Sequence, residues 1–119
     1  MLPETYQQAY TAFERSLEQF SGVFRDPNSP KPLIHKSFQA VQQSFQTVLD
    51  LGLDGLDPQQ STNAQSYYTE INKQLRLLGM DVMFLQASRQ SATSTQRQQQ
   101  MGERLERLRV YCEALLSEG

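Results

Sequence analysis

The stretch that decides the fold is Tyr68-Thr-Glu-Ile-Asn-Lys-Gln-Leu-Arg-Leu-Leu-Gly-Met-Asp-Val-Met-Phe-Leu85. Its apolar residues recur every three or four positions, as they do along one side of an α-helix. The main stripe consists of Tyr68, Ile71, Leu75, Leu78, Val82 and Leu85. A second, shorter stripe consists of Leu77, Met80, Met83 and Phe84. A helix that is apolar on two sides normally has neighbours on both flanks, so the stretch predicts the central helix of a bundle.

Three other segments carry apolar residues at the same alternating steps of four and three. Such a row of apolar residues, called a seam below, is typical of helices that pack side by side; the main stripe of residues 68–85 is the central seam. The three seams are Tyr6, Tyr10, Phe13, Leu17, Phe20 and Phe24; Ile34, Phe38, Val41, Phe45 and Val48; and Met101, Leu105, Leu108, Cys112 and Leu115. We predict helices at about 3–24, 33–51, 62–90 and 95–117. Because short connections make successive helices antiparallel, the sequence predicts an all-α, up-down-up-down four-helix bundle that occupies residues 1–119 as a single domain.

Local sequence signals set the expected helix ends. The prolines between Arg25 and Pro32 cannot lie inside a helix, so they separate the first two helices. Gly52 can adopt the left-handed conformation that ends the second helix. Three residues with good N-cap side chains stand where the third helix should begin, Ser61, Thr62 and Asn63.

A change of seam phase separates the third and fourth helices. Projecting the central seam forward would place the polar residues Gln96 and Gln99 on it, whereas the fourth seam begins at Met101. This change predicts a short turn or kink at residues 91–95. Thr93 followed three positions later by Gln96 also has the form of a capping box, which begins a helix.

Composition limits the class of protein. The chain of 119 residues has a formal net charge of −2 and a pI near 5.3, which argues against a general nucleic-acid binder. It has one cysteine and no apolar run of the ~18 residues that a membrane helix needs. The first residues, Met1 to Glu4, have neither the charged nor the apolar part of a signal peptide. We therefore expect a cytoplasmic protein with no membrane span and no disulfide.

The residue types that most often carry chemistry are sparse. His35 is the only histidine, which excludes the Glu-x-x-His pairs of a di-iron bundle. Cys112 lies on the seam of the fourth helix, so we predict that it is a small buried apolar residue. Asp50, Asp54 and Asp57 lack the spacing of a calcium loop, so they predict an acidic turn. We expect no catalytic residue, no metal ion and no cofactor, and hence no enzyme.

Three features in or beside the seams have structural consequences. Asp81 flanks the central seam and, if it is half-buried, it needs a partner such as an arginine or a backbone group. Gly79 is either a tolerated defect, which costs ~1 kcal/mol against alanine, or a place where a neighbouring helix comes close. Tyr6 and Tyr10 are expected to bury their rings and to keep their hydroxyls in water.

Three stretches together resemble one protein family. They are Met1-Leu-Pro-x-x-Tyr-x-x-x-Tyr10, Asp81-Val-Met-Phe-Leu-Gln-Ala-Ser-Arg-Gln-Ser-Ala-Thr93 and Leu108-Arg-Val-Tyr-Cys-Glu-Ala-Leu-Leu116. They are similar to the cyanobacterial PatD-like family, the heterocyst frequency control proteins. The resemblance covers essentially the whole chain, and its most specific part is the Asp-x-x-Phe-Leu-Gln-x-x-Arg-Gln core.

The resemblance implies a small, non-enzymatic, all-helical cytosolic protein. The best-known member of the family binds the tubulin-like division GTPase FtsZ and thereby couples cell division to the frequency of heterocyst differentiation. Because the family also occurs in cyanobacteria that form no heterocysts, the link to division is the expectation for this chain, with recruitment to the division site.

The expected binding residues are exposed polar ones near the end of the third helix and on the fourth. They are Arg89, Gln90, Arg97, Arg104 and Arg107. Glutamates interleave with the arginines of the fourth helix, so this basic side is either a solvated, salt-bridged face or a face for an acidic partner segment. The long seams also favour a homodimer, in which a helix packs across a symmetry axis.

An alternative function belongs to a different class. Methionines and aromatic residues at helical spacing could hold a small ligand or pigment between the helices. The cluster that favours this alternative is Tyr67, Tyr68, Met80, Met83 and Phe84.

Overall fold

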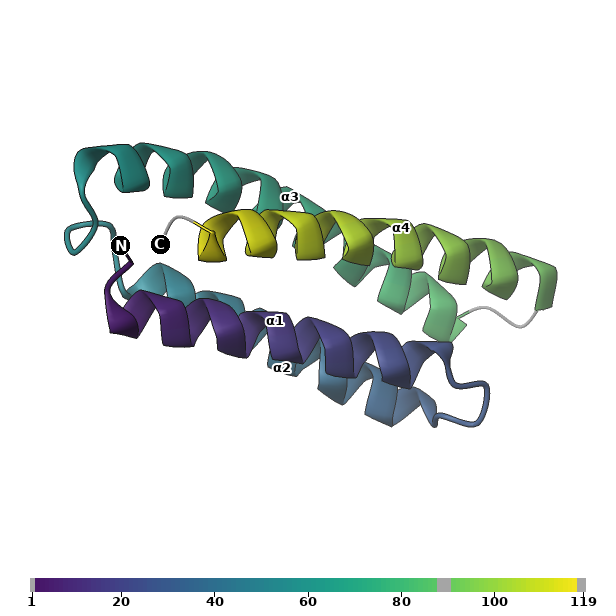
Figure 1. Cartoon of the computed structure of the whole chain (residues 1–119). Helices are drawn as coiled ribbons and strands as arrows, with labels where there is room; N and C mark the ends of the chain where they lie inside the picture. The colour runs from purple at the N-terminus through teal and green to yellow at the C-terminus, as the bar shows by residue number, and fades with distance from the viewer. Residues whose placement is uncertain (1, 88–90, 118–119) are drawn as a thin grey trace.

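The computed structural model describes residues 2–87 and 91–117, with side chains for 2–87 and 95–117. Its helices are α1 (Glu4–Arg25), α2 (Lys31–Asp50), α3 (Pro58–Ala87) and α4 (Ser91–Leu116). They run alternately up and down, and each packs on its two neighbours, because α4 closes the ring by packing on α1 (Figure 1). The molecule measures 49 × 20 × 19 Å. The predicted all-α four-helix bundle is confirmed, and these described residues contain no strand.

The four predicted seams supply most of the core, which Leu2, Ala9, Leu56 and Ala64 complete. Every residue of those seams is buried, which confirms that the spacing of three and four identifies the inward side of each helix. Aromatic rings join α1 to α2, since the ring centres of Phe13 and Phe45 lie 5.3 Å apart and those of Phe20 and Phe38 lie 5.5 Å apart.

The tyrosine hydroxyls of α1 are not left to water, so that expectation is wrong. The Tyr6 hydroxyl donates a hydrogen bond of 2.9 Å to the carbonyl oxygen of Gly52, in the loop that follows α2. The Tyr10 and Tyr68 hydroxyls share a buried hydrogen bond of 2.7 Å. Gly52 has φ +68°, which confirms the left-handed conformation expected at the end of α2.

The start of α3 differs from the prediction. The helix begins at Pro58, so the N-cap expected at Ser61, Thr62 or Asn63 is wrong. The Asp57 carboxylate accepts a hydrogen bond of 2.7 Å from the Gln60 N–H, and the Gln60 side chain accepts one of 3.2 Å from the Asp57 N–H. This reciprocal pair is a capping box, and proline is well suited to the first helical position.

The start of α4 also lies earlier than predicted. The helix already includes residues 91–95, so the turn or kink expected there is wrong. The last described residue of α3 is Ala87. Arg89 and Gln90 lie outside the described residues, and so does the side chain of Thr93 with its expected cap.

Three of the four residues in the second apolar stripe of α3 are not covered by a neighbouring helix, whereas Leu77 is half-buried. In the ring of four helices α3 packs on α2 and α4, but Met80, Met83 and Phe84 point outward and are all exposed. The prediction that both sides of α3 are covered is therefore wrong. Gly79 marks a close approach, since a methyl group there would lie 3.3 Å from the Phe38 ring of α2.

Candidate functional site

Asp81 is a buried carboxylate between α3 and α4, with 1% of its surface exposed. One of its oxygens accepts a hydrogen bond of 3.1 Å from Arg97, and the other accepts one from Arg104. The same nitrogen of Arg104 lies 2.9 Å from the Leu77 carbonyl oxygen, to which it also donates. The expectation that Asp81 needs an arginine partner is confirmed.

The spacing on α4 explains why two arginines reach one carboxylate. Arg97 and Arg104 are seven residues apart, or about two helical turns, so they lie on the same side of α4. A buried carboxylate is costly unless it is paired and hydrogen-bonded, and here each oxygen has its own guanidinium partner. The cluster fixes the register of α4 against α3.

Arg97 links this buried cluster to the surface. Its guanidinium carbon lies 4.8 Å from the centre of the Phe84 ring, within the range of a cation–π interaction. A weaker hydrogen bond of 3.4 Å joins Arg97 to the side chain of Gln100. About a quarter of the Arg97 side chain is exposed, so its charge borders on solvent.

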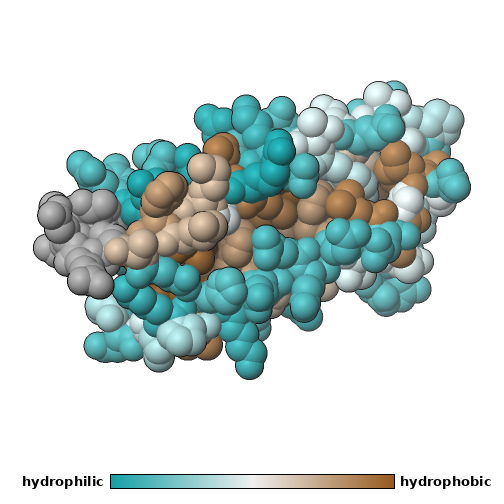
Figure 2. Space-filling model, turned by 180° about the vertical axis from the view of Figure 1, so that it is seen from behind, coloured by the Kyte–Doolittle hydropathy of each residue, from teal (hydrophilic) through white to brown (hydrophobic). Residues whose placement is uncertain are grey.

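Met80, Met83 and Phe84 form an exposed apolar patch, called the α3 patch below. Their exposed fractions are 52%, 70% and 51%. The three side chains lie within one turn of α3, at steps of three and four. Figure 2 shows apolar surface next to the grey atoms, and it continues along the middle of that face. Exposed apolar patches with a polar surround mark interaction sites.

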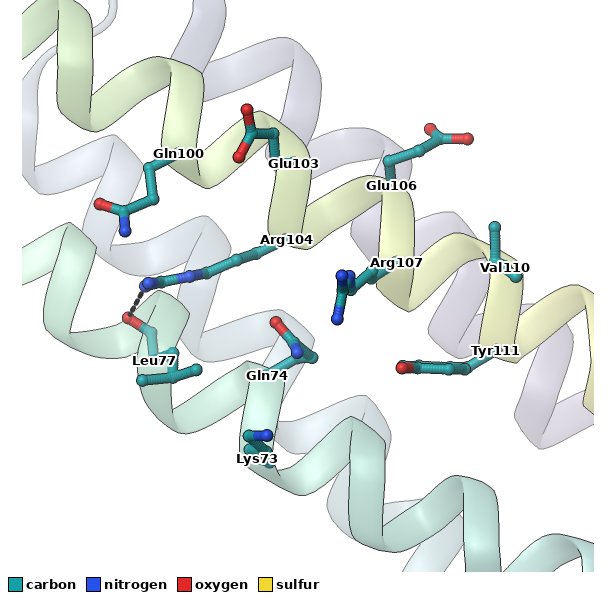
Figure 3. A pocket seen from close by; sticks show the side chains of 10 residues that line it. All are labelled: Lys73, Gln74, Leu77, Gln100, Glu103, Arg104, Glu106, Arg107, Val110 and Tyr111. Atoms are coloured by element: carbon teal, nitrogen blue, oxygen red, sulfur yellow. Dashed lines mark hydrogen bonds between the residues drawn. The ribbon is translucent and has the colours of Figure 1, made fainter.

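A surface groove of ≈ 800 Å³ lies between α3 and α4. Its lining residues are Lys73, Gln74, Leu77, Gln100, Glu103, Arg104, Glu106, Arg107, Val110 and Tyr111. Figure 3 shows Arg104 reaching from α4 to the Leu77 carbonyl, while Glu106 points away from α3. The groove carries both signs of charge and suits polar contacts with another molecule.

The structure separates the five predicted binding residues. Arg97 and Arg104 bind Asp81 and lie partly within the bundle. Arg107 is exposed and lines the groove. Arg89 and Gln90 lie outside the described residues, so nothing is shown of their place.

Sequence reasoning missed the α3 patch as a surface. A signal was present, because Met80 lies one turn from Arg76 and two turns from Lys73 on the same side of the helix. Both cations are exposed, and a helix side that carries lysine and arginine is seldom buried against a third neighbour. The prediction gave more weight to the apolar residues on two sides of the helix than to these two cations.

Three side chains that often carry chemistry lie in different environments. Cys112 is buried, its thiol donates to the Tyr10 carbonyl oxygen at 3.3 Å, and burial raises the pKa of the thiol to about 12. Burial and the hydrogen bond shared with Tyr10 raise the pKa of Tyr68. His35 is exposed on α2. A thiol that stays protonated at neutral pH is a poor nucleophile and a poor metal ligand.

The described residues contain neither a cluster of metal ligands nor a membrane-spanning helix. Within residues 2–87 and 91–117, no three histidine, cysteine or acidic side chains are grouped closely enough to hold a metal ion. No helix in the same part of the chain is both long and apolar enough to cross a membrane. Comparisons of the chain with protein-family models, with curated proteins and with solved structures found no match.

Proposed function

We propose that this chain is a non-enzymatic regulatory protein that binds the division GTPase FtsZ and modulates its assembly. Where cells differentiate, the same binding would link division to heterocyst frequency. The observation that carries the proposal is the α3 patch, since three large apolar side chains stand exposed on one turn of a well-packed bundle. The partner itself is suggested by the resemblance of the sequence to the PatD-like family.

The chemistry of the patch supports a protein partner. Methionine and aromatic side chains are enriched at protein interfaces, and methionine adapts its shape to a partner. Arg97 lies over Phe84 at the edge of the patch, and arginine is also enriched at such interfaces. A cytoplasmic protein of this kind would be recruited to the division site by FtsZ itself.

The alternative, a carrier of a small ligand or pigment, has less support. It requires the methionines and tyrosines to converge on one enclosed site. Met80, Met83 and Phe84 are exposed on the outside of α3, whereas Tyr68 is buried against Tyr10 in the core. Tyr67 instead packs on Tyr111 of α4, with 6.0 Å between the ring centres.

The test is co-sedimentation with FtsZ from the same organism in the presence of GTP. We expect the wild-type protein to pellet with FtsZ polymer and to change the amount of polymer. The double variant Met83→Glu/Phe84→Glu should bind at least about tenfold more weakly, because a charge at a central contact typically costs more than 1 kcal/mol.

Ala12→Glu is the matched control. It also places a carboxylate at an exposed position, but on α1, the helix that does not pack on α3. This variant should bind FtsZ as the wild type does. If the wild-type protein neither sediments with FtsZ nor alters its polymer, the proposed function is wrong.

A further inference from the structure

We propose that the α3 patch docks an acidic amphipathic helix of a protein partner. Apolar residues of that helix would cover the patch, and its carboxylates would pair with the surrounding cations. This inference rests on the proposed function only for the name of the partner, because the chemistry of the docked segment follows from the surface itself.

The apolar centre sets the shape of the segment. Met80, Met83 and Phe84 occupy a single turn on one face of α3. Helices pack by fitting rows of side chains at steps of three and four between one another. An amphipathic helix with apolar residues at those steps is therefore the natural complement of this face.

The exposed charges of α3 near the patch have one sign. The exposed residues of α3 from position 69 onward are Thr69, Asn72, Lys73, Arg76, Met80, Met83, Phe84 and Ala87. None of them is a carboxylate, although the whole chain has a net charge of −2. This part of α3 has two acidic residues: Glu70 is half-buried and lies nearly three turns before Met80, and Asp81 is buried and bound to two arginines.

Three cations lie around the patch on different helices and form its basic rim. Arg76 lies one turn before Met80 on α3. Arg97 of α4 covers one side of Phe84. Lys31 of α2 lies at the C-terminal end of α3, where its ammonium donates a hydrogen bond of 2.6 Å to the Gln86 carbonyl. A partner with carboxylates on either side of its apolar residues would meet opposite charges on all three sides.

Arg97 is held in place before a partner arrives. Asp81, Gln100 and the Phe84 ring fix its guanidinium, so little side-chain freedom is lost when a carboxylate binds it. Because Asp81 also has Arg104, the cluster of one carboxylate and two guanidinium groups keeps a net positive charge beside the patch.

The test is selection from a displayed library of random peptides of about 16 residues, roughly four helical turns. The immobilised wild-type chain is the bait, and the variant Met83→Glu/Phe84→Glu removes peptides that bind elsewhere. We expect the enriched peptides to contain more Asp and Glu than Lys and Arg, with apolar residues at steps of three and four.

A synthetic copy of the most enriched peptide then serves as the ligand in fluorescence anisotropy. Its Kd should rise at least about tenfold with Met83→Glu/Phe84→Glu and severalfold with Arg76→Glu, and it should also rise with added salt. Ala12→Glu and Arg109→Glu, which change exposed residues of α1 and α4 outside the patch and its basic rim, should leave the Kd unchanged. Met83→Ser gives a milder apolar loss if the double variant does not fold.

Several results would overturn the inference. They are enrichment of basic or uncharged peptides, no enrichment at all, and a Kd that the patch variants do not change. Two other occupants are tested directly. Flotation with anionic phospholipid vesicles that the patch variants abolish would point to a membrane, and a wild-type dimer that they convert to monomer would point to a second copy.

The outcomes also separate this inference from the proposed function. If the patch selects acidic helices while the wild-type protein ignores FtsZ, the docking surface stands and the partner is wrong. If FtsZ binds equally well to the wild type and to the patch variants, the partner stands and the docking surface is wrong.

Discussion

The guanidinium of Arg97 lies 4.8 Å from the centre of the Phe84 ring while it also hydrogen-bonds the buried carboxylate of Asp81. One side chain of α4 thus joins a charge cluster inside the bundle to an apolar patch on its surface. The position of the Phe84 side chain in the patch and the packing of α3 on α4 therefore both depend on Arg97.

Replacing Asp81 should destabilise the protein strongly. Asp81→Asn leaves two partly buried guanidinium groups without their carboxylate, and breaking a buried, hydrogen-bonded charge pair typically costs about 3–5 kcal/mol. We expect a loss near the lower end of that range, because Arg97 and Arg104 retain some exposure. Urea unfolding measures it.

Glu106→Gln is the matched control for Asp81→Asn. It also removes one carboxylate charge, but from the exposed Arg109–Glu106 pair, whose nearest atoms are 3.5 Å apart. Such pairs contribute about 0–1 kcal/mol. Equal losses from the two variants would show that burial of Asp81 has no energetic consequence.

The capping box at the start of α3 should contribute to stability. Asp57→Ala removes the oxygen that accepts the Gln60 N–H, and loss of an N-cap typically costs ~1 kcal/mol. Thermal unfolding should show a lower Tm for Asp57→Ala than for Asp54→Ala, which changes an exposed residue of the same loop. A Tm that is the same for both variants would contradict the role of the cap.

Stability should fall in alkali because of Cys112. The folded thiol has a pKa of about 12, above its ordinary value of 9.0. Below pH 9 both states keep the proton, so the effect is absent. Between pH 9 and pH 12 the unfolded state loses the proton first, and the free energy of unfolding falls by about 1.4 kcal/mol per pH unit.

Urea unfolding of the wild type and of Cys112→Ala across this range isolates that effect. Removing the thiol lowers stability below pH 9, since it leaves a small cavity, and the slope above pH 9 should be shallower by about one proton. Tyr68, whose pKa is also raised, adds a similar loss above its ordinary value of 10.0 in both proteins. Parallel slopes would contradict the assignment.

The same glycine-to-alanine change should have opposite effects at two positions. Gly52→Ala forces an L-residue into φ +68°, which costs about 1–2 kcal/mol. Gly22 lies in α1 with nothing within 4 Å of an added methyl group, so Gly22→Ala should stabilise the helix by about 0.5–1 kcal/mol. A lower Tm for Gly52→Ala and a higher Tm for Gly22→Ala would confirm both; shifts of the same sign would contradict this reading.

The sequence by itself determined which side of each helix is buried. Every seam residue from Tyr6 to Leu115 lies in the core, because the period of 3.6 residues is a property of the helix alone and needs no knowledge of its neighbours. The sequence also indicated the end of α2 at Gly52, since the left-handed conformation is a local preference of glycine.

Only the tertiary structure determined which side of α3 stays exposed to solvent and which partners the charges beside it have. In a ring of four helices each helix has two neighbours, so α3 buries its main stripe and leaves Met80, Met83 and Phe84 outside. Likewise, Arg97 and Arg104 look like surface charges along α4, and they meet Asp81 only because the two helices pack side by side. Local periodicity cannot specify such contacts, because they depend on the number and placement of the neighbouring helices.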